Sequence, residues 1–264
     1  MTLTMPSLAS IALYANFSSA RMGKQQVLGP INLAIPSGQW IAVVGPNGAG
    51  KTTLVGQLTG NVPPDSGTIR FAGQDITRLP THKRMHLGLA RSFQITSVLR
   101  EFTALENVAL AVQAHAGHSF RFLADARSDE RLRSPARRGL EDVGLGDRAN
   151  TLAAALSHGE QRQLEIAMAL AGDPSLLLLD EPMAGMGVEE SQRMIGFLQA
   201  LKGKRAMLLI EHDMDAVFQL ADRITVLVYG RAIASGTPAE IRANEDVRHA
   251  YLGDDGLGDG EIAA

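Results

Sequence analysis

The chain has 264 residues, a formal net charge of -3 and no cysteine. This length permits one or two domains of ~150 residues, and we expect a single domain with an inserted helical subdomain. The lack of cysteine excludes disulfides and thiolate metal sites, and a slightly acidic chain gives no electrostatic reason to expect a nucleic-acid partner.

The N-terminal segment carries no pattern of a secretion signal. Its first basic residue is Arg21, and no apolar stretch anywhere reaches the ~20 residues that cross a bilayer. We therefore expect a soluble, cytoplasmic chain.

Residues 8–17 and 31–35 have strand patterns, and residues 67–71 begin a third strand that turns at Gly73 and Gln74. These strands should form a small, largely antiparallel sheet.

A glycine-rich loop follows next, between a predicted strand and a predicted helix. Residues 40–44 are a continuous apolar run, typical of a strand buried on both faces, and residues 52–59 can continue as a helix. The sequence GPNGAGKT joins them. Its glycines allow backbone N–H groups to point inward at an anion at the positive end of the helix. A glycine turn without a ligand is the alternative.

Within this loop we predict two roles beyond backbone contacts. Lys51 adds a positive charge at the β- and γ-phosphates, and the Thr52 hydroxyl can ligate magnesium. The predicted nucleotide-binding residues of the loop are Gly45, Pro46, Asn47, Gly48, Ala49, Gly50, Lys51, Thr52 and Thr53.

Residues 95–156 have a helical pattern, with Ser134 and Pro135 as a start signal and Gly144 as a stop. Arginines and acids are interleaved in this segment, which indicates a solvated helix surface rather than a dedicated binding patch. The residues concerned are Arg121, Arg127, Arg131, Arg133, Arg137, Arg138, Asp125, Asp129 and Glu130.

The segment LSHGEQRQLEIA, residues 156–167, begins a helix. Ser157 and Glu160 have the spacing of a capping box, so one interpretation is a well-capped helix that needs no ligand. In the other interpretation, the Ser157 hydroxyl and the Gly159 N–H donate to a phosphate of a second subunit. Both interpretations can hold, at different nucleotide states.

Two acids follow the apolar residues 176–179. A strand there would deliver Asp180 and Glu181 to the C-terminal edge of a sheet, where ligands of open α/β folds bind. Asp180 could hold magnesium through its water shell, and Glu181 could polarise a water for attack on the γ-phosphate. An ordinary helix start is the alternative.

Further along, residues 206–210 resemble a central strand, and residues 224–228 and 231–235 resemble a hairpin. Residues 253–264 have the composition of a disordered tail.

The chain contains five short motifs, which follow one another in the order GPNGAGKT, RSFQ, LSHGE, LLLLDE and IEHD. In that order they resemble the Walker A, Q-loop, signature, Walker B and switch motifs of the ATP-binding subunit of an ABC transporter. The resemblance spans nearly the whole chain. It implies an α/β fold, a P-loop NTPase of ABC type with a mixed central sheet flanked by helices, an antiparallel β subdomain and a helical subdomain at about residues 95–156. The ATP-binding domain would cover residues 1–252.

The same resemblance assigns functions to single residues. Glu181 would be the catalytic acid, Gln94 would sense magnesium and the γ-phosphate, and His212 would contact the γ-phosphate or the attacking water. The implied cofactors are ATP and Mg²⁺, with Thr52, Gln94 and Asp180 at the metal. The implied partners are transmembrane permease subunits, a second ATP-binding subunit (the same chain or a different one) and, indirectly, a solute-binding protein. Such a protein would lie at the cytoplasmic face of the membrane.

The chain departs from the family pattern at three places. The signature has His158 where glycine is usual and Glu160 where glutamine is usual, and Glu160 puts negative charge near a phosphate site unless its carboxylate turns to the helix cap. Residues 184–187 lack the usual terminal aspartate of the D-loop. The sequence offers three candidates for the residue that stacks on adenine: Met22, which has a suitable register, and the aromatic residues Phe17 and Tyr14.

Local phrases narrow the resemblance to a group of importers. DEPMAGMG, EHDMD and DVRHAYLG are most similar to ATPase subunits that serve branched-chain amino acids, with urea and amide importers as relatives. The alternative functions are the ATPase of a lipid or lipopolysaccharide exporter, a soluble ABC protein of DNA repair or chromosome structure, and a small-molecule kinase. The soluble class would need a long coiled-coil insertion for which the chain has no room, and a kinase would not need all five motifs.

Overall fold

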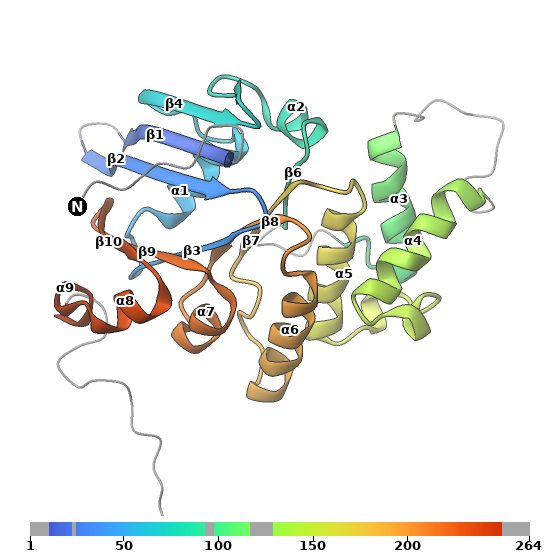
Figure 1. The fold of residues 1–264 in the computed structure, drawn as a ribbon. Coiled ribbons are helices and arrows are strands. Elements are labelled where there is room, and N and C mark those ends of the chain that lie inside the picture. The colour runs from blue at the N-terminus through green and yellow to red at the C-terminus, as the bar shows by residue number, and fades with distance from the viewer. Residues whose placement is uncertain (1–10, 23–24, 93–97, 117–128, 250–264) are drawn as a thin grey trace, which may run out of the picture. The chain divides into compact units, whose positions relative to one another are not determined.

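The computed structural model describes residues 11–22, 25–92, 98–116 and 129–249 (Figure 1). By its internal contacts the chain divides into two compact units, residues 1–78 with 209–264, and residues 79–208. Within the described ranges, no helix is both long and apolar enough to cross a membrane. The predicted disordered tail, residues 253–264, lies outside them.

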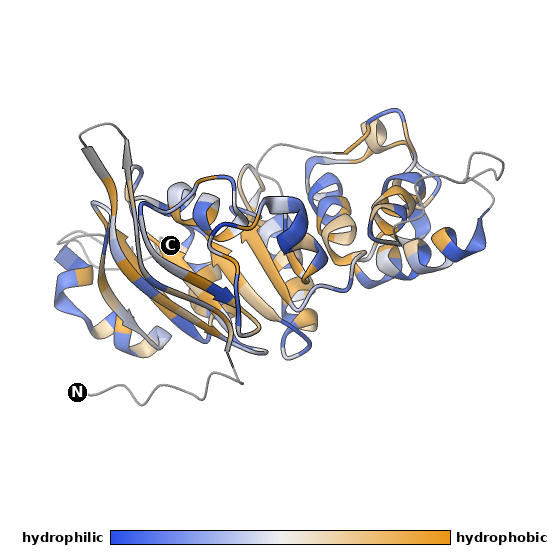
Figure 2. Cartoon of the chain, turned by 90° about the horizontal axis from the view of Figure 1, so that it is seen from above, coloured by the Kyte–Doolittle hydropathy of each residue, from blue (hydrophilic) through white to orange (hydrophobic). Residues whose placement is uncertain are grey.

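The first unit contains a four-stranded antiparallel sheet in the order β2-β1-β4-β5. Along β2 the side chains alternate between buried, as at Ile31 and Leu33, and exposed, as at Asn32, because successive residues of a strand face opposite sides. Figure 2 shows this change of hydropathy along the strands. The predicted antiparallel sheet is confirmed. Its strands are β1 (Ile11–Met22), β2 (Gln25–Pro36), β4 (Ser66–Phe71) and β5 (Gln74–Asp75).

Two of these strands are longer than the sequence pattern predicted. β1 continues five residues past Phe17, and β2 begins six residues before Ile31. Backbone pairing explains both extensions, since Met22 pairs with Gln25 and the ladder runs from there to Ile11 opposite Pro36. The alternating pattern fades near the turn, but the ladder does not depend on apolar side chains.

The first unit also contains the strand that leads into the glycine loop. β3 (Trp40–Val44) is buried at every residue and pairs in parallel with β9 (Arg223–Val228). β9 turns at Tyr229 and Gly230 into the antiparallel strand β10 (Arg231–Gly236). The predicted buried strand and the predicted hairpin are thus confirmed. The helices of this unit are α1 (Lys51–Thr59), α7 (Met214–Leu220), α8 (Pro238–Ala243) and α9 (Glu245–Val247).

The second unit combines short parallel strands with a cluster of helices. β6 (Leu89–Arg91) pairs in parallel with β7 (Leu176–Asp180), and β8 (Ala206–Ile210) begins in this unit and continues into the first along the chain. Its helices are α2 (Thr81–His86), α3 (Ala104–Ala116), α4 (Glu130–Asp142), α5 (His158–Leu170) and α6 (Val188–Leu201), with short 3₁₀ turns η2 (Gly146–Arg148) and η3 (Ala153–Ala155).

Helices α3, α4 and α5 share one hydrophobic core (Figure 1). Val108 from α3, Leu140 from α4 and Leu164 from α5 are fully buried in it. Because each helix turns an apolar stripe toward the others, the three helices stabilise one another. The predicted helical pattern over residues 95–156 therefore contains α3 and α4, and the outline of a separate helical subdomain stays a prediction.

The predicted start of α4 at Ser134 and Pro135 is wrong. The helix begins five residues earlier, at Glu130, and Pro135 lies inside it. Asp129 explains the difference, because its carboxylate accepts a hydrogen bond from the Arg131 N–H (3.0 Å) and caps the helix. The predicted stop is confirmed, since α4 ends at Asp142 and Gly144 follows in the left-handed conformation with φ 76°.

The arginines of α4 support the interpretation of a solvated helix surface. Arg131 pairs with Asp129 at 2.7 Å and Arg137 with Glu130 at 2.9 Å, and the side chains of Arg131, Arg137 and Glu130 are exposed. Arg121 and Arg127 lie outside the described residues.

Candidate nucleotide-binding site

The glycine loop of the first unit packs tightly against neighbouring backbone. A Cβ on Gly45 would lie 2.1 Å from the carbonyl oxygen of Leu227, and one on Gly50 would lie 2.9 Å from that of Val27. Gly50 also has φ 98° and forms the N-cap of α1. The loop therefore needs glycine at these positions for space as well as for backbone conformation.

A matched pair of glycine substitutions tests this packing. Gly45→Ala should lower the free energy of unfolding by about 3 kcal/mol or more, because the new Cβ meets a backbone carbonyl that cannot rotate away. Gly48→Ala should cost only about 1 kcal/mol, since Gly48 has φ 80° but nothing within 4 Å of the added carbon. Urea denaturation measures both, and equal losses would contradict the argument.

The start of α1 is well suited to an anion. Among the described side chains none caps this helix, and its first turn contains no acid. The positive end of the helix dipole is thus not neutralised locally, which is the condition for binding phosphate there. Thr52 is exposed and Thr53 half-buried on that first turn, while Pro46, Asn47 and Gly48 are exposed on the loop and Ala49 is buried.

Lys51 is held inside the curve of the loop. Its side-chain nitrogen donates to the carbonyl oxygens of Gly45 (2.6 Å) and Pro46 (3.2 Å), and the residue is only 8% exposed. A lysine so placed brings its charge to the anion site before any ligand arrives. An anion held by the loop N–H groups and by this ammonium would be bound by charge-assisted hydrogen bonds.

The predicted acids of the second unit lie at the end of β7. Asp180 is its last residue, is 2% exposed, and accepts a hydrogen bond from the Arg91 guanidinium at 2.8 Å. Glu181 follows with φ 48°, a left-handed conformation that is uncommon outside glycine. Its carbonyl oxygen accepts from Arg162 (3.1 Å), which also pairs with Glu165 at 2.6 Å. The backbone that carries Glu181 is thus fixed by a buried ion pair.

Sequence reasoning missed both of these arginines. Arg162 and Glu165 stand three residues apart on a predicted helix, and that spacing could have indicated an ion pair. No local pattern marks Arg91 as the partner of Asp180, because their pairing depends on the register of β6 against β7.

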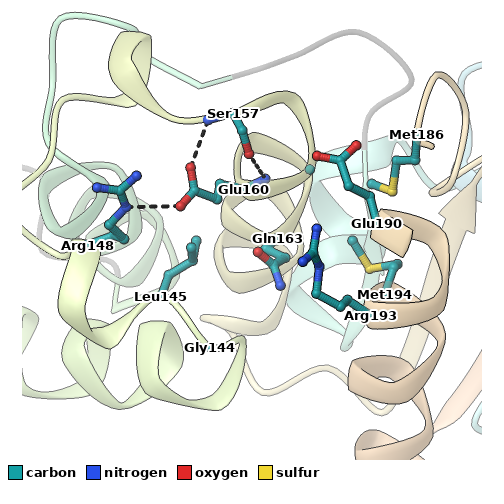
Figure 3. A pocket seen from close by; sticks show the side chains of 11 residues that line it. Gly144, Leu145, Arg148, Ser157, Glu160, Gln163, Met186, Glu190, Arg193 and Met194 are labelled. Atoms are coloured by element: carbon teal, nitrogen blue, oxygen red, sulfur yellow. Dashed lines mark hydrogen bonds and ion pairs between the residues drawn. The ribbon is translucent and has the colours of Figure 1, made fainter. Parts of the chain in front are cut away.

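The signature segment forms the capping box that its spacing predicted. The Ser157 hydroxyl accepts from the Glu160 N–H (3.2 Å), and the Glu160 carboxylate accepts from the Ser157 N–H (2.8 Å). The second carboxylate oxygen accepts from Arg148 (3.0 Å), as Figure 3 shows. The negative charge of Glu160 is therefore turned to the helix cap and compensated by a cation. Ser157 is exposed and Gly159 half-buried at the start of α5.

The Glu160 contacts give a pH-dependent prediction. The hydrogen bond from Arg148, followed by those from Ser157, holds the pKa of Glu160 below its usual 4.5 against the opposing effect of burial. A depressed carboxylate pKa stabilises the fold above about pH 4.5, and this contribution is lost as the pH falls through the lowered value.

Glu160→Gln retains a capping-box acceptor but loses the ion pair. We expect it to reduce the free energy of unfolding at pH 7 by about 0.2–1 kcal/mol, because the Arg148 side chain is half-exposed. The difference from wild type should stay constant down to about pH 5 and decrease as the pH falls below about 4.5. Chemical denaturation across this range measures it, and a difference that grows in acid would contradict the assignment.

A cavity of about 560 Å³ lies beside the signature, entirely within the second unit (Figure 3). Arg148, Ser157 and Glu160 line one side, and Glu190, Arg193 and Met194 of α6 line the other. Next to it, the imidazole of His158 lies 3.6 Å from where a Cβ on Gly185 would be. Residues 184–187 lead into α6, which has no side-chain cap, and the Met186 N–H donates to the Met183 carbonyl (3.1 Å) just before it.

The remaining predicted site residues have the following places. His212 follows β8, has a side chain 61% exposed, and donates its backbone N–H to the buried Glu211 carboxylate at 3.0 Å. Tyr14 is half-buried in β1 between Ala34 and Arg70 of the two flanking strands. Gln94 and the side chains of Phe17 and Met22 lie outside the described residues.

The predicted site residues are divided between the units. The glycine loop and His212 belong to the first, and Ser157, Gly159, Asp180 and Glu181 to the second. Within the second unit the structure brings the two acids together with Arg91 and Arg162.

Comparison with protein families gives two matches. The family model described as "ABC transporter" matches residues 28–184, and that described as "Branched-chain amino acid ATP-binding cassette transporter" matches residues 233–256. The chain is 39% identical to the high-affinity branched-chain amino acid transport ATP-binding protein BraF of Pseudomonas aeruginosa, over 89% of this chain and 94% of BraF.

The chain is also similar to the ATP-binding protein of an export system and to a solved ATP-binding cassette. The lipopolysaccharide export system ATP-binding protein LptB of Escherichia coli is 32% identical, over 91% of this chain and 96% of LptB. The crystal structure of the ATP-binding cassette MJ1267 in its ADP conformation superposes with a TM-score of 0.81 at 27% identity, over 92% of this chain and 99% of that one.

Proposed function

This chain belongs to the ATP-binding subunits of ABC transporters, in their branched-chain amino-acid transport group, and we propose from that membership how its residues use ATP. It is the ATPase of an importer, and the observation that carries this assignment is the match of residues 233–256 to the branched-chain family model. That segment lies beyond the motifs that importers and exporters share.

The glycine loop binds the phosphates of ATP. Backbone N–H groups of Gly45 and of residues 47–53, at the loop and the start of α1, surround the phosphate oxygens, and Lys51 places its ammonium at the β- and γ-phosphates. The support is local: an uncapped helix start without acids, and a lysine already held at the loop by two carbonyls.

Magnesium fits the oxygen donors that the chain offers. The Thr52 hydroxyl and the Asp180 carboxylate would hold it, with Gln94 as a third contact. Among the described residues no three or more His, Cys, Asp or Glu side chains gather as a metal cage. This suits Mg²⁺, which usually takes one or two protein ligands and completes its shell with phosphate oxygens and water. When bound, it neutralises charge that develops on the phosphates during hydrolysis.

Glu181 accepts a proton from the attacking water, and His212 contacts the γ-phosphate or that water. The Arg162 contact to the Glu181 carbonyl supports this role, because a base must be held within hydrogen-bond reach of the proton it takes. The exposed side chain of His212 is available for such a contact.

A second ATP-binding subunit completes each site. The Ser157 hydroxyl and the Gly159 N–H, at the positive end of α5, bind the γ-phosphate held by the glycine loop of the partner. ATP thus closes the pair, and hydrolysis reopens it. The Glu160 carboxylate does not oppose this, because Arg148 and the helix cap engage it.

The membrane partners are permease subunits at the cytoplasmic face. We place their contact near residues 94–101, of which Leu99, Arg100 and Glu101 are exposed. A mostly apolar cavity of about 140 Å³ supports this place, since Ala90 and Arg91, just before that segment, line it together with Met85 and Met168. An apolar side chain of a permease helix would fill it.

Transport in liposomes tests the function. The chain is reconstituted with its permease subunits and solute-binding protein, and ATP is supplied on the side of the ATPase. We expect uptake of leucine, isoleucine or valine against a gradient, with phosphate release that depends on the solute-binding protein. ATP-driven extrusion of lipid instead would identify an exporter, and a phosphorylated small-molecule product would identify a kinase.

A further inference from the structure

The carboxylate of Asp180 is buried and pairs with Arg91. β6 and β7 run in parallel with Arg91 opposite Leu178, so the long Arg91 side chain reaches two residues further along β7. Its Nη2 atom lies 2.8 Å from Oδ2 of Asp180. The side chains are 17% and 3% exposed, respectively. Such a pair is little screened by water, and the contact restricts rotation of the carboxylate.

We propose that Arg91 is a positioning residue for the magnesium site: it holds Oδ2 of Asp180 and so presents Oδ1 to the hydration shell of the metal. This proposal rests on the proposed role of Asp180. A carboxylate with one oxygen fixed needs no reorientation when Mg·ATP arrives, so the ion pair should increase the affinity for the metal-bound nucleotide.

The same ion pair could have two other effects, and each of them predicts a different result for magnesium binding when Arg91 is replaced. If Arg91 only compensated a buried charge, its loss would destabilise the fold and leave the use of magnesium unchanged. If it acted mainly as a competing cation, its loss would strengthen magnesium binding. The magnesium dependence of ATP binding therefore separates positioning from both.

The second buried ion pair beside the acids strengthens the interpretation. Arg162, which pairs with Glu165, donates a hydrogen bond to the carbonyl of Glu181, while Arg91 holds the side chain of Asp180. Adjacent residues with different proposed tasks are thus fixed by different arginines, one through backbone and one through side chain.

The experiment measures ATP affinity of the full chain twice, with Mg²⁺ and with EDTA, by fluorescence of a labelled ATP analogue. The quantity of interest is the dissociation constant in EDTA divided by the dissociation constant in Mg²⁺, which is the gain in affinity that magnesium gives. The variants are Arg91→Met, Arg91→Lys and Asp180→Asn. Arg205→Met is the matched control, because Arg205 is equally buried (16% exposed) and pairs with Asp173, an exposed acid away from the proposed site. Circular dichroism and urea denaturation establish that each variant folds.

We expect Arg91→Met to reduce the magnesium-dependent gain in affinity about tenfold, the equivalent of about 1.4 kcal/mol. Arg91→Lys should restore part of it, since a lysine keeps a cation near the carboxylate. Arg205→Met should leave the ratio unchanged. An unchanged or increased ratio in folded Arg91→Met protein overturns the proposal, and if that variant does not fold, a wild-type ratio in Arg91→Lys does so.

The Asp180→Asn variant separates this inference from the function on which it rests. A loss of the magnesium effect in Asp180→Asn but not in the Arg91 variants refutes only the positioning role. A normal magnesium effect in Asp180→Asn refutes the metal role of Asp180 itself. As a second readout, the Mn²⁺ electron paramagnetic resonance spectrum in the presence of ATP should show a weakened bound-metal signal in Arg91→Met.

Discussion

Glu181→Gln is expected to lower steady-state ATP hydrolysis by about 10²- to 10⁴-fold while ATP binding stays near the wild-type value. The amide is nearly the same size as the carboxylate but cannot accept the proton of the attacking water. The backbone should not change, because Arg162 contacts the carbonyl oxygen of Glu181 rather than its side chain. Phosphate release and equilibrium binding of labelled ATP measure the two quantities.

The control for this variant is Glu189→Gln. Glu189 is an exposed acid in the first turn of α6, and its substitution changes the net charge by the same amount. We expect it to keep wild-type hydrolysis within about twofold. Wild-type turnover in Glu181→Gln would remove Glu181 from the chemistry and leave His212 as the remaining candidate for the proton transfer.

Lys51→Ala should weaken ATP binding itself, by about 10- to 100-fold. A charge-assisted hydrogen bond contributes about 1.5–3 kcal/mol, and the ammonium that two loop carbonyls hold in place is lost. The two carbonyls also lose their donor, so the apo loop should become less stable. Titration with labelled ATP at constant ionic strength measures the affinity.

Lys83→Ala provides the comparison, because Lys83 is an exposed lysine of α2. If both lysine variants lost affinity equally, the effect would come from net charge and not from the loop. Equal affinity of Lys51→Ala and wild type would contradict the proposed phosphate site.

The elements with the strongest sequence signals were predicted to the residue. β3 and β8 are five-residue apolar runs that are buried along their whole length. In an α/β fold, such runs are typical of central strands that are covered on both faces. The capping box of α5 was equally clear, since Ser157 and Glu160 have the spacing that joins side chain and backbone within one helical turn.

Other features could not be predicted, either because their local signal was weak or because they depend on distant residues. The predicted start of α4 was wrong because Asp129 lies in a run of mixed charges, where its capping role has no distinct signal. Pro135 also misled the prediction, because proline is common at the first position of a helix. The ion pair between Glu160 and Arg148 joins residues twelve positions apart. The contact between Arg91 and Asp180 joins residues 89 positions apart.

The capping box has one consequence for the rate at which a dimer can close. In the cap, the Ser157 hydroxyl oxygen uses a lone pair to accept the Glu160 N–H, whereas its proton remains a donor. In the proposed dimer, the serine can therefore cap its helix and donate a hydrogen bond to a phosphate of the partner at the same time. In the proposed dimer, the cap restricts the Ser157 side chain before the two subunits meet, so that less conformational entropy is lost on encounter.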